Sequence, residues 1–421
     1  MHSMLLGVAK NTMKAWTETK KIKPEDFERI QESVDSMIVP HDVGRIPGKI
    51  KTGFSGFTAD QWKNWTIHYS LIALKDILPQ QDYLCWQKFV IACRLICSRY
   101  VTVQDLDLAQ AKLKEFNIKF AALYGNDFCN PNMHLNMHIK DCVMDHGPVY
   151  SFWLFSFERY NGILGATVTN NRLISVQLMR KFLQSSFLQG VTWPLDFTKY
   201  ETILQCDSKK KEKGTLKSVD LCTEAITNAL AETKAIDEND FTAADYQIPL
   251  GKVQEAILCD DDITDVKEML SKLYKERVVT VLSIVEHHRR IIQGKYTIYA
   301  GETNGSTISA VWYGRDGDII TEGEARVGNV NNLLTVDCVV HQGFKKKKLT
   351  HHIAHISWYK KHPNKDFYGE PVTLWEPNVE ACSCATYMPL QRIKSLCVVT
   401  RRGVKIFNTV ENVLLTSPIN Y

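Results

Sequence analysis

The 421-residue chain lacks any apolar run long enough to cross a membrane. Its densest apolar stretch, Phe89–Cys97, is interrupted by Arg94, whereas a membrane-spanning helix needs about 20 apolar residues. The apolar core of a signal peptide is also lacking, because Met4-Leu5-Leu6 is soon followed by Lys10. We therefore expect an intracellular protein with no membrane partner.

Paired cysteines and a strong net charge are lacking too. The 12 cysteines include no C-x-x-C pair, and without a secretion signal we expect them to be reduced thiols. The net charge of +4 is too small to indicate nucleic-acid binding by itself. Any contact with DNA must therefore come from local groups of basic residues.

Common catalytic signatures are missing as well. The sequence contains no P-loop, no G-x-S-x-G, no G-x-G-x-x-G and no kinase-type motif, which argues against the nucleotide-dependent and serine-hydrolase classes. Asp260-Asp261-Asp262 lacks the glycine and glutamate spacing of a calcium loop.

The pattern of apolar residues divides the chain into three parts. Helical spacing and helix-start signals dominate residues 1–195, and a lysine-rich linker followed by further helical spacing occupies residues 196–293. From Gly294, short β-rich runs separated by turn signals predict a small antiparallel barrel or sandwich. We therefore expect a multi-domain α+β protein with a helical domain (1–195), a helical linker region (196–293) and a β-rich domain (294–421). The expected strands are Tyr296–Tyr299, Ile308–Tyr313, Leu333–Val340, Ile353–Tyr359, Val372–Trp375 and Leu396–Thr400.

Glu158 is the first candidate for chemistry. It lies in an apolar segment, Tyr150–Leu164, that we expect to form a buried helix. A buried carboxylate is costly without a partner, and the adjacent Arg159 does not face it in a helix. The partner is either a divalent metal or an arginine elsewhere in the core, and the residues alone favour the arginine.

His134 and His138 form the second candidate group. At this spacing on a helix, two imidazoles share one face, which suits a zinc ion. Two ligands do not make a site, however, and two unrelated histidines explain the spacing equally well.

Basic residues form two groups that are candidates for contact with nucleic acid. Lys345, Lys346, Lys347 and Lys348, followed by His351 and His352, form the clearest basic patch. It is either a solvated loop tip between strands or a contact for a phosphate backbone. The second group, Arg172, Arg180 and Lys181, lies on or near the polar side of an amphipathic helix, Leu173–Leu188.

Several longer segments carry a resemblance to a known family. They are Met1–Gly7, Val39–Pro47, Gly53–Trp65, Pro131–Leu135, Gly147–Gly162, Thr169–Met179 and Trp358–Asp366. Together they resemble the transposase of CACTA (EnSpm-like) elements. The resemblance is strong up to about residue 190, weaker over the last 120 residues and weakest between them.

The resemblance implies an RNase H-like core in which two aspartates and one glutamate hold two Mg²⁺ or Mn²⁺ ions for phosphodiester cleavage and strand transfer. In this family the glutamate lies on a late helix, after a large helical insertion. Glu158 matches that position, so the resemblance favours a catalytic role for it. The implied partner is DNA at transposon ends, and the implied location is the nucleus.

The resemblance also implies a structural zinc site with His2, His134 and His138 as ligands. The family has an aspartate three residues before this first histidine, at a position that would precede Met1. We therefore expect His134 and His138 to share a helix face, His2 to approach them, and Glu158 to lie nearby on the next helix.

The two catalytic aspartates of the family are not found in this sequence. We therefore expect the C-terminal part of a DDE-type cut-and-paste transposase that is inactive alone. The alternative is a domesticated DNA- or chromatin-binding module without catalysis. The sequence leaves a role as an interaction scaffold and self-association open.

Overall fold

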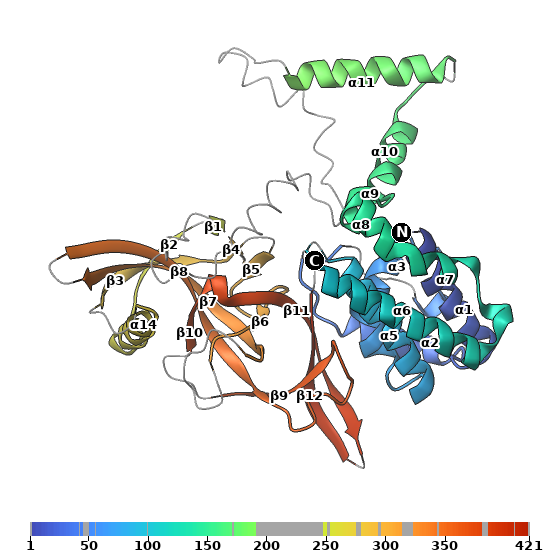
Figure 1. Cartoon of the computed structure of the whole chain (residues 1–421). Helices are drawn as coiled ribbons and strands as arrows, with labels where there is room; N and C mark the ends of the chain where they lie inside the picture. The colour runs from blue at the N-terminus through green and yellow to red at the C-terminus, as the bar shows by residue number, and fades with distance from the viewer. Residues whose placement is uncertain are drawn as a thin grey trace.

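The structure is a computed structural model, and Figure 1 shows the whole chain. It describes residues 2–41, 43–44, 50–54, 56–98, 100–170, 172–190, 247–250, 253–274, 279–293, 296–313, 323–342, 345–380, 386–407 and 409–419.

Helices of the N-terminal part begin where the sequence supplies capping side chains. Thr58 and Thr102 each form a capping box with the residue three positions later, which satisfies backbone donors at the first turn. Asn130 caps the next helix, with Pro131 at its first position. The elements are η1 (His2–Ala9), α1 (Lys10–Glu18), α2 (Asp26–Asp35), η2 (Ile50–Thr52), α3 (Ala59–Asn64), η3 (Trp65–Tyr69), α4 (Ser70–Leu74), α5 (Gln80–Ile96), α6 (Val103–Tyr124), η4 (Asn126–Phe128), α7 (Pro131–Leu135), η5 (Asn136–His138), α8 (Ile139–His146), α9 (Val149–Phe152), α10 (Phe155–Ala166) and α11 (Ile174–Gly190).

Edge-to-face and tilted contacts between aromatic side chains hold the first helices together. Trp16 of α1 meets Trp86 of α5 with ring centroids 5.2 Å apart. Phe89 of α5 meets Phe116 of α6 at 5.0 Å, and Phe116 meets Phe120 at 5.4 Å. Such aromatic contacts add to the burial of apolar area. The helical character expected for residues 1–195 is therefore confirmed over the part that the structure describes, which ends at residue 190.

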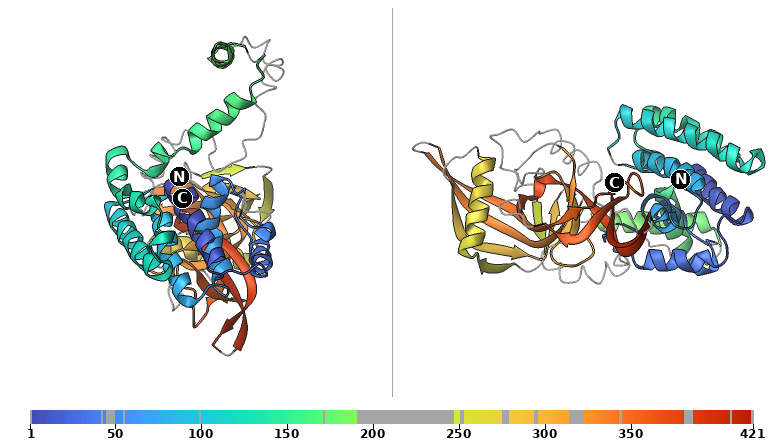
Figure 2. Two further views of the ribbon diagram at one scale, coloured as in Figure 1. Left: turned by 90° about the vertical axis from the view of Figure 1, so that its right-hand side faces the viewer. Right: turned by 90° about the horizontal axis from the view of Figure 1, so that it is seen from below.

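The single buried helix expected over Tyr150–Leu164 is wrong. The segment forms two helices, α9 and α10, with a non-helical connection between them. The apolar side chains of α10 are largely exposed to solvent. Phe157 is 63% exposed and Tyr160 is 62% exposed. Figures 1 and 2 show that α10 and α11 extend away from the rest of the helices. An apolar segment is expected to pack against another apolar surface. Its composition does not show whether that second surface belongs to the same chain.

The C-terminal part is antiparallel throughout its described pairings. Its strands are β1 (Gln247–Leu250), β2 (Gln254–Ile257), β3 (Val279–His288), β4 (Arg290–Gln293), β5 (Tyr296–Tyr299), β6 (Thr307–Ala310), β7 (Arg326–Gln342), β8 (Lys345–Lys361), β9 (Thr373–Val379), β10 (Tyr387–Pro389), β11 (Ile393–Ile406) and β12 (Thr409–Pro418). Strands β7, β8, β9, β12, β11 and β6 pair in that order, and β6 pairs again with β7, so the six strands close a ring. The expected antiparallel β-rich C-terminal part is thus confirmed, although its strands begin at Gln247 and not near Gly294.

Residues inside the ring form their own apolar cluster. It consists of Val327, Tyr359, Trp375, Cys397, Val399 and Leu414. These residues come from five of the ring strands, β7, β8, β9, β11 and β12, which places the cluster within the ring. Beyond the ring, β10 pairs with β8, and β3 and β2 extend the sheet from β7. A separate sheet has the order β1-β4-β5.

The helical interpretation of residues 215–293 is wrong for most of its described portion. From Gln247 onward the chain forms β1 to β4, and only α14 (Asp260–Leu273) is a helix. In β3 the pairing with β7 shifts register between Val281 and Val285, so the alternation of buried and exposed residues that identifies a strand is interrupted. The stretch 191–246 lies outside the described residues.

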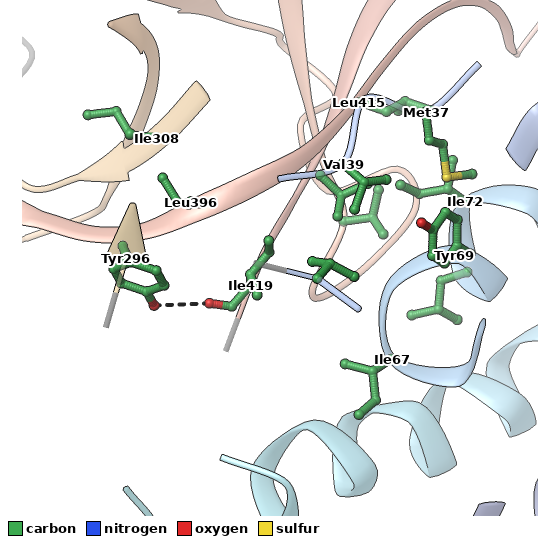
Figure 3. Packing of buried hydrophobic residues seen from close by; sticks show 14 of the residues in the cluster. Met37, Val39, Ile67, Tyr69, Ile72, Tyr296, Ile308, Leu396, Leu415 and Ile419 are labelled. Carbon is green, nitrogen blue, oxygen red and sulfur yellow. Dashed lines mark hydrogen bonds between the residues drawn. The ribbon is translucent and has the colours of Figure 1, made fainter. Parts of the chain in front are cut away.

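The helical and β parts share one continuous apolar core. Met37, Ile67 and Ile72 of the helical part belong to the same cluster as Leu415 and Ile419 of the β part, and Figure 3 shows these side chains converging. The backbones of Ile38 and Val399 form a bridge, with N···O distances of 2.7 and 3.0 Å. No described helix has the length and apolar character needed to span a membrane.

A buried arginine crosses this contact. Nη1 of Arg94, on α5, donates to the Ile67 carbonyl at 3.1 Å and to Oγ of Ser417 at 3.5 Å, and Nη2 donates to the Pro418 carbonyl. Burial lowers the pKa of Arg94 to about 10. A guanidinium withdrawn from water in this way is stable only while its hydrogen bonds are made.

Replacing Arg94 by methionine is expected to lower the free energy of unfolding by about 2–4 kcal/mol, because buried carbonyl acceptors lose their donor. Urea denaturation measures the change. The matched control is Arg29→Met, since Arg29 is 56% exposed in its ion pair with Asp26. This substitution is expected to lower the free energy of unfolding by about 1 kcal/mol or less. An Arg94→Met protein as stable as the parent would contradict this account of the interface.

Candidate functional site

Glu158 lies on the surface, in the first turn of α10. Its backbone N–H donates to the Leu154 carbonyl at 2.9 Å, and a carboxylate in a first helical turn is favoured by the helix dipole. The side chain is 49% exposed. The core ion pair with a distant arginine, one of the two expectations for this residue, is therefore wrong.

His2 is the residue that Glu158 contacts. Nε2 of His2 lies 3.2 Å from Oε1 of Glu158, and the imidazole is 53% exposed. The expectation of Glu158 on the next helix after the histidines is wrong, because α8 and α9 lie between them in the chain. Glu158 does lie beside His2, and the contact joins the first segment of the family resemblance to the segment that carries the glutamate.

The packing of η1 against α7 and η5 holds His2 in place. Oγ of Ser3 donates to Oδ1 of Asn136 at 2.5 Å, and Nδ2 of Asn130 donates to the Gly7 carbonyl at 3.4 Å. Gly7 permits this approach, because a Cβ at that position would lie 2.6 Å from Nδ2 of Asn132. The N-terminal helix is thus fixed on the segment that bears the other two histidines.

His134 and His138 lie side by side, as expected, with ring centroids 5.0 Å apart and planes at 78°. Both are exposed, so they do not line the core. Nδ1 of His138 is 3.8 Å from the Asp141 carboxylate. Among the described residues, no three His, Cys, Asp or Glu side chains are grouped to hold a metal. The zinc site of His2, His134 and His138 therefore stays a prediction from the resemblance.

The same test applies to the two-metal centre. Two divalent cations need several carboxylates around them, whereas the described residues provide no such group around Glu158. The residues present do not fit a two-metal centre, so no metal-dependent step is derived for this chain.

Helix α10 also carries exposed apolar side chains. Phe157 (63%), Tyr160 (62%), Ile163 (55%) and Leu164 (42%) are all exposed. Exposed apolar surface of this extent is typical of an interaction site. The sequence showed the apolar residues but placed them in the core.

The basic residues of the α11 region face solvent. Arg172, Arg180 and Lys181 are all exposed, and Nζ of Lys181 donates to the Val168 carbonyl at 2.6 Å. Helix α11 contains no acidic residue. Its positive charge is therefore not neutralised within the helix.

The lysine run belongs to a strand, so the expected loop tip is wrong. Lys345 to Lys348 begin β8 and pair with the end of β7, from Gln342 to Val339. Lys346, Lys347 and Lys348 are exposed, and Lys348 forms an ion pair with Asp337 at 2.7 Å. Figure 1 shows the β7–β8 hairpin and α11 at separate extremities, so the structure does not bring the two basic groups together.

His351 and His352, which the sequence placed in the basic patch, are buried. Nε2 of His351 lies 2.8 Å from the Tyr274 hydroxyl. Nδ1 of His352 lies 2.7 Å from Oγ1 of Thr335, and the same oxygen lies 2.7 Å from Nε2 of His288. Burial lowers the pKa of both His351 and His352 to about 4. They are therefore neutral core residues and add no positive charge to the lysines.

No protein-family model, curated protein or solved structure matches the chain. The resemblance to CACTA transposases therefore rests on the sequence segments alone.

The buried histidines make stability depend on pH. In the unfolded chain they bind protons as the pH falls below the ordinary value of 6.5, whereas in the folded chain they do so only near 4. The unfolded state thus binds more protons in this window, and the free energy of unfolding is expected to fall as the pH is lowered from 6.5 to 4.

The variant His351→Gln/His352→Asn keeps side-chain atoms for both hydrogen bonds but does not titrate, so it is expected to flatten this part of the profile. Denaturation at a series of pH values measures the slope. The exposed His134→Asn serves as the control. A profile equally steep in the double variant would refute the assignment.

Proposed function

We propose that this chain is derived from a DDE-type cut-and-paste DNA transposase of the CACTA type, acts on DNA in the nucleus and carries the glutamate of that enzyme at Glu158. The observation that carries the proposal is the contact between His2 and Glu158. Two segments that resemble the family independently, at opposite ends of the helical part, meet with 3.2 Å between Nε2 and Oε1. A chance resemblance gives no reason for these residues to be neighbours.

The exposure of α10 supports the same proposal. A catalytic glutamate must face the substrate, and Glu158 is 49% exposed rather than buried in an ion pair. The apolar side chains beside it, Phe157 and Tyr160 among them, remain uncovered in the described structure. In the family, the helix of the glutamate packs on the RNase H-like core. An exposed apolar face next to Glu158 has the chemistry that such packing needs.

A DNA-binding module without catalysis is the second candidate. The exposed, acid-free surface of α11 and the exposed lysines at the start of β8 favour it. Contact with phosphates requires only accessible cations, whereas cleavage requires a complete set of metal ligands. The two candidates share DNA as the partner and differ in whether Glu158 matters.

The purified chain is expected to give no metal-dependent cleavage of a CACTA transposon-end duplex in Mg²⁺ or Mn²⁺, because the carboxylates for two cations are not grouped around Glu158 in its described residues. A gel assay for nicked strands measures this. Cleavage by the chain alone that disappears in Glu158→Gln would overturn the expectation.

Complementation separates the two candidates. Adding the aspartate-bearing core of a CACTA transposase is expected to give cleavage that Glu158→Gln reduces by about 100-fold or more, since one group in a catalytic unit commonly contributes that much. The control is Glu18→Gln, because Glu18 is also 50% exposed in an ion pair. Cleavage that is indifferent to Glu158 favours the binding module.

Binding to duplex DNA is expected to weaken steeply with salt, because each neutralised phosphate releases counterions. The charge reversals Lys346→Glu/Lys347→Glu and Arg180→Glu/Lys181→Glu are each expected to reduce the slope of log K against log salt by about 2. Titrations at several salt concentrations measure the slope. Lys14→Glu is the control, since Lys14 is 67% exposed on α1. Unchanged slopes in both double variants would remove these residues from the DNA surface.

A further inference from the structure

The β11–β12 hairpin ends in an exposed phenylalanine. The last described cross-strand pair is Ile406 with Thr409, and Phe407 directly follows Ile406. Figures 1 and 2 show the hairpin, at the red end of the colour scale, projecting from the body of the molecule. The side chain of Phe407 is 77% exposed, and Val410 on the returning strand is 74% exposed.

Phe407 has a backbone conformation that does not suit it. Its φ is 54°, in the left-handed region, where a side chain with a Cβ crowds the backbone and where Gly, Asn or Asp is usual in a two-residue turn. Burial of the ring does not compensate for this, because the ring is in solvent. The fold therefore gives no reason for phenylalanine at this position, and such strain is typical of functional positions.

One face of the hairpin is anchored to the helical part. Nη2 of Arg402 lies 3.1 Å from Oδ2 of Asp76 and 3.1 Å from the Ile72 carbonyl. Glu411, next to Val410, lies 2.9 Å from Nε2 of His362. The Arg402 contacts hold the middle of the hairpin on the helical part, and the contact of Glu411 with His362, which follows β8, holds the third cross-strand pair from the tip and occupies the acidic residue of the hairpin.

The opposite face carries positive charge, and Nη2 of Arg401 on it also donates to the Tyr359 hydroxyl at 3.4 Å. Arg401, Gly403 and Lys405 alternate with the anchored residues, and all three are exposed. Gly403 pairs with Asn412, and Lys405 pairs with Val410. This face thus combines two cations with the apolar tip.

We propose that this hairpin is a wedge for duplex DNA, in which Phe407 inserts between base pairs while Lys405 and Arg401 contact the phosphates. A two-stranded antiparallel ribbon is narrow enough to enter a DNA groove. Apolar side chains that enter a base step unstack it and kink the duplex, and the neighbouring cations offset the charge of the backbone. The inference deepens the proposed function, on which it rests for DNA as the partner.

The test uses the full chain and a duplex with 2-aminopurine in its centre and a fluorophore pair at its ends. The wild-type chain is expected to raise 2-aminopurine fluorescence and to shorten the end-to-end distance. Phe407→Asn is expected to lose both signals and to raise Kd by about 10-fold. Asn adopts positive φ more readily than Phe, so this variant is expected to melt at the same or a higher temperature, which separates lost insertion from lost folding.

Two further variants sharpen the result. Lys405→Glu is expected to weaken binding and to reduce the salt slope by about 1. Ile118→Asn, which removes an equally apolar side chain that is 63% exposed on α6, is expected to leave both signals unchanged.

Unstacking that persists in Phe407→Asn overturns the wedge and leaves the proposed function standing. A wild-type chain that binds no duplex DNA, even at low salt, overturns both. Binding to phosphatidylserine vesicles that requires Phe407, together with DNA signals that do not, assigns the tip to a lipid surface and also overturns the wedge.

Discussion

The architecture depends on the buried guanidinium of Arg94. It comes from the middle of α5 and meets the carbonyls of Ile67 and Pro418, so a helix of the first part is tied to the last strand of the second. Water is kept away from a charge in this position only if the surfaces around it fit closely. The bridge between Ile38 and Val399 and the shared apolar core meet that requirement. These contacts together join the helices and the strand ring into one packed body.

Helices α10 and α11 extend from this packed body and differ from it in the exposure of their apolar side chains. The His2–Glu158 contact lies where the tightly packed helices end, and beyond it α10 and α11 carry apolar side chains into solvent. In a self-contained domain these residues would be covered, since leaving them in water costs free energy. Their exposure beside the one carboxylate singled out by the resemblance is the structural reason to regard the region as one face of a larger assembly.

Local signals in the sequence predicted local structure well. The capping residues Thr58 and Asn130 located the starts of helices, and four consecutive β-formers located β5, because these patterns depend on neighbours in the chain. The sequence did not predict β3 or the environments of His351 and Glu158, because each depends on distant residues. A register shift against β7 interrupts the alternation in β3, Tyr274 meets His351 across the fold, and the missing cover of α10 decides the exposure of Glu158. The family resemblance placed Glu158 near the histidines, but it did not predict the direct contact with His2.

The net charge of +4 is distributed unevenly over the described part of the molecule. Many of its cations are neutralised in ion pairs on the compact body, such as Lys51 with Glu28 and Lys360 with Glu376. The exposed cations of α11, of the start of β8 and of the outer face of the β11–β12 hairpin lie on projecting elements. An approaching charged ligand meets the electrostatic field of these projecting cations before it reaches the nearly neutral body. On the proposal that duplex DNA is the partner, these separated cations would contact different phosphates along one duplex.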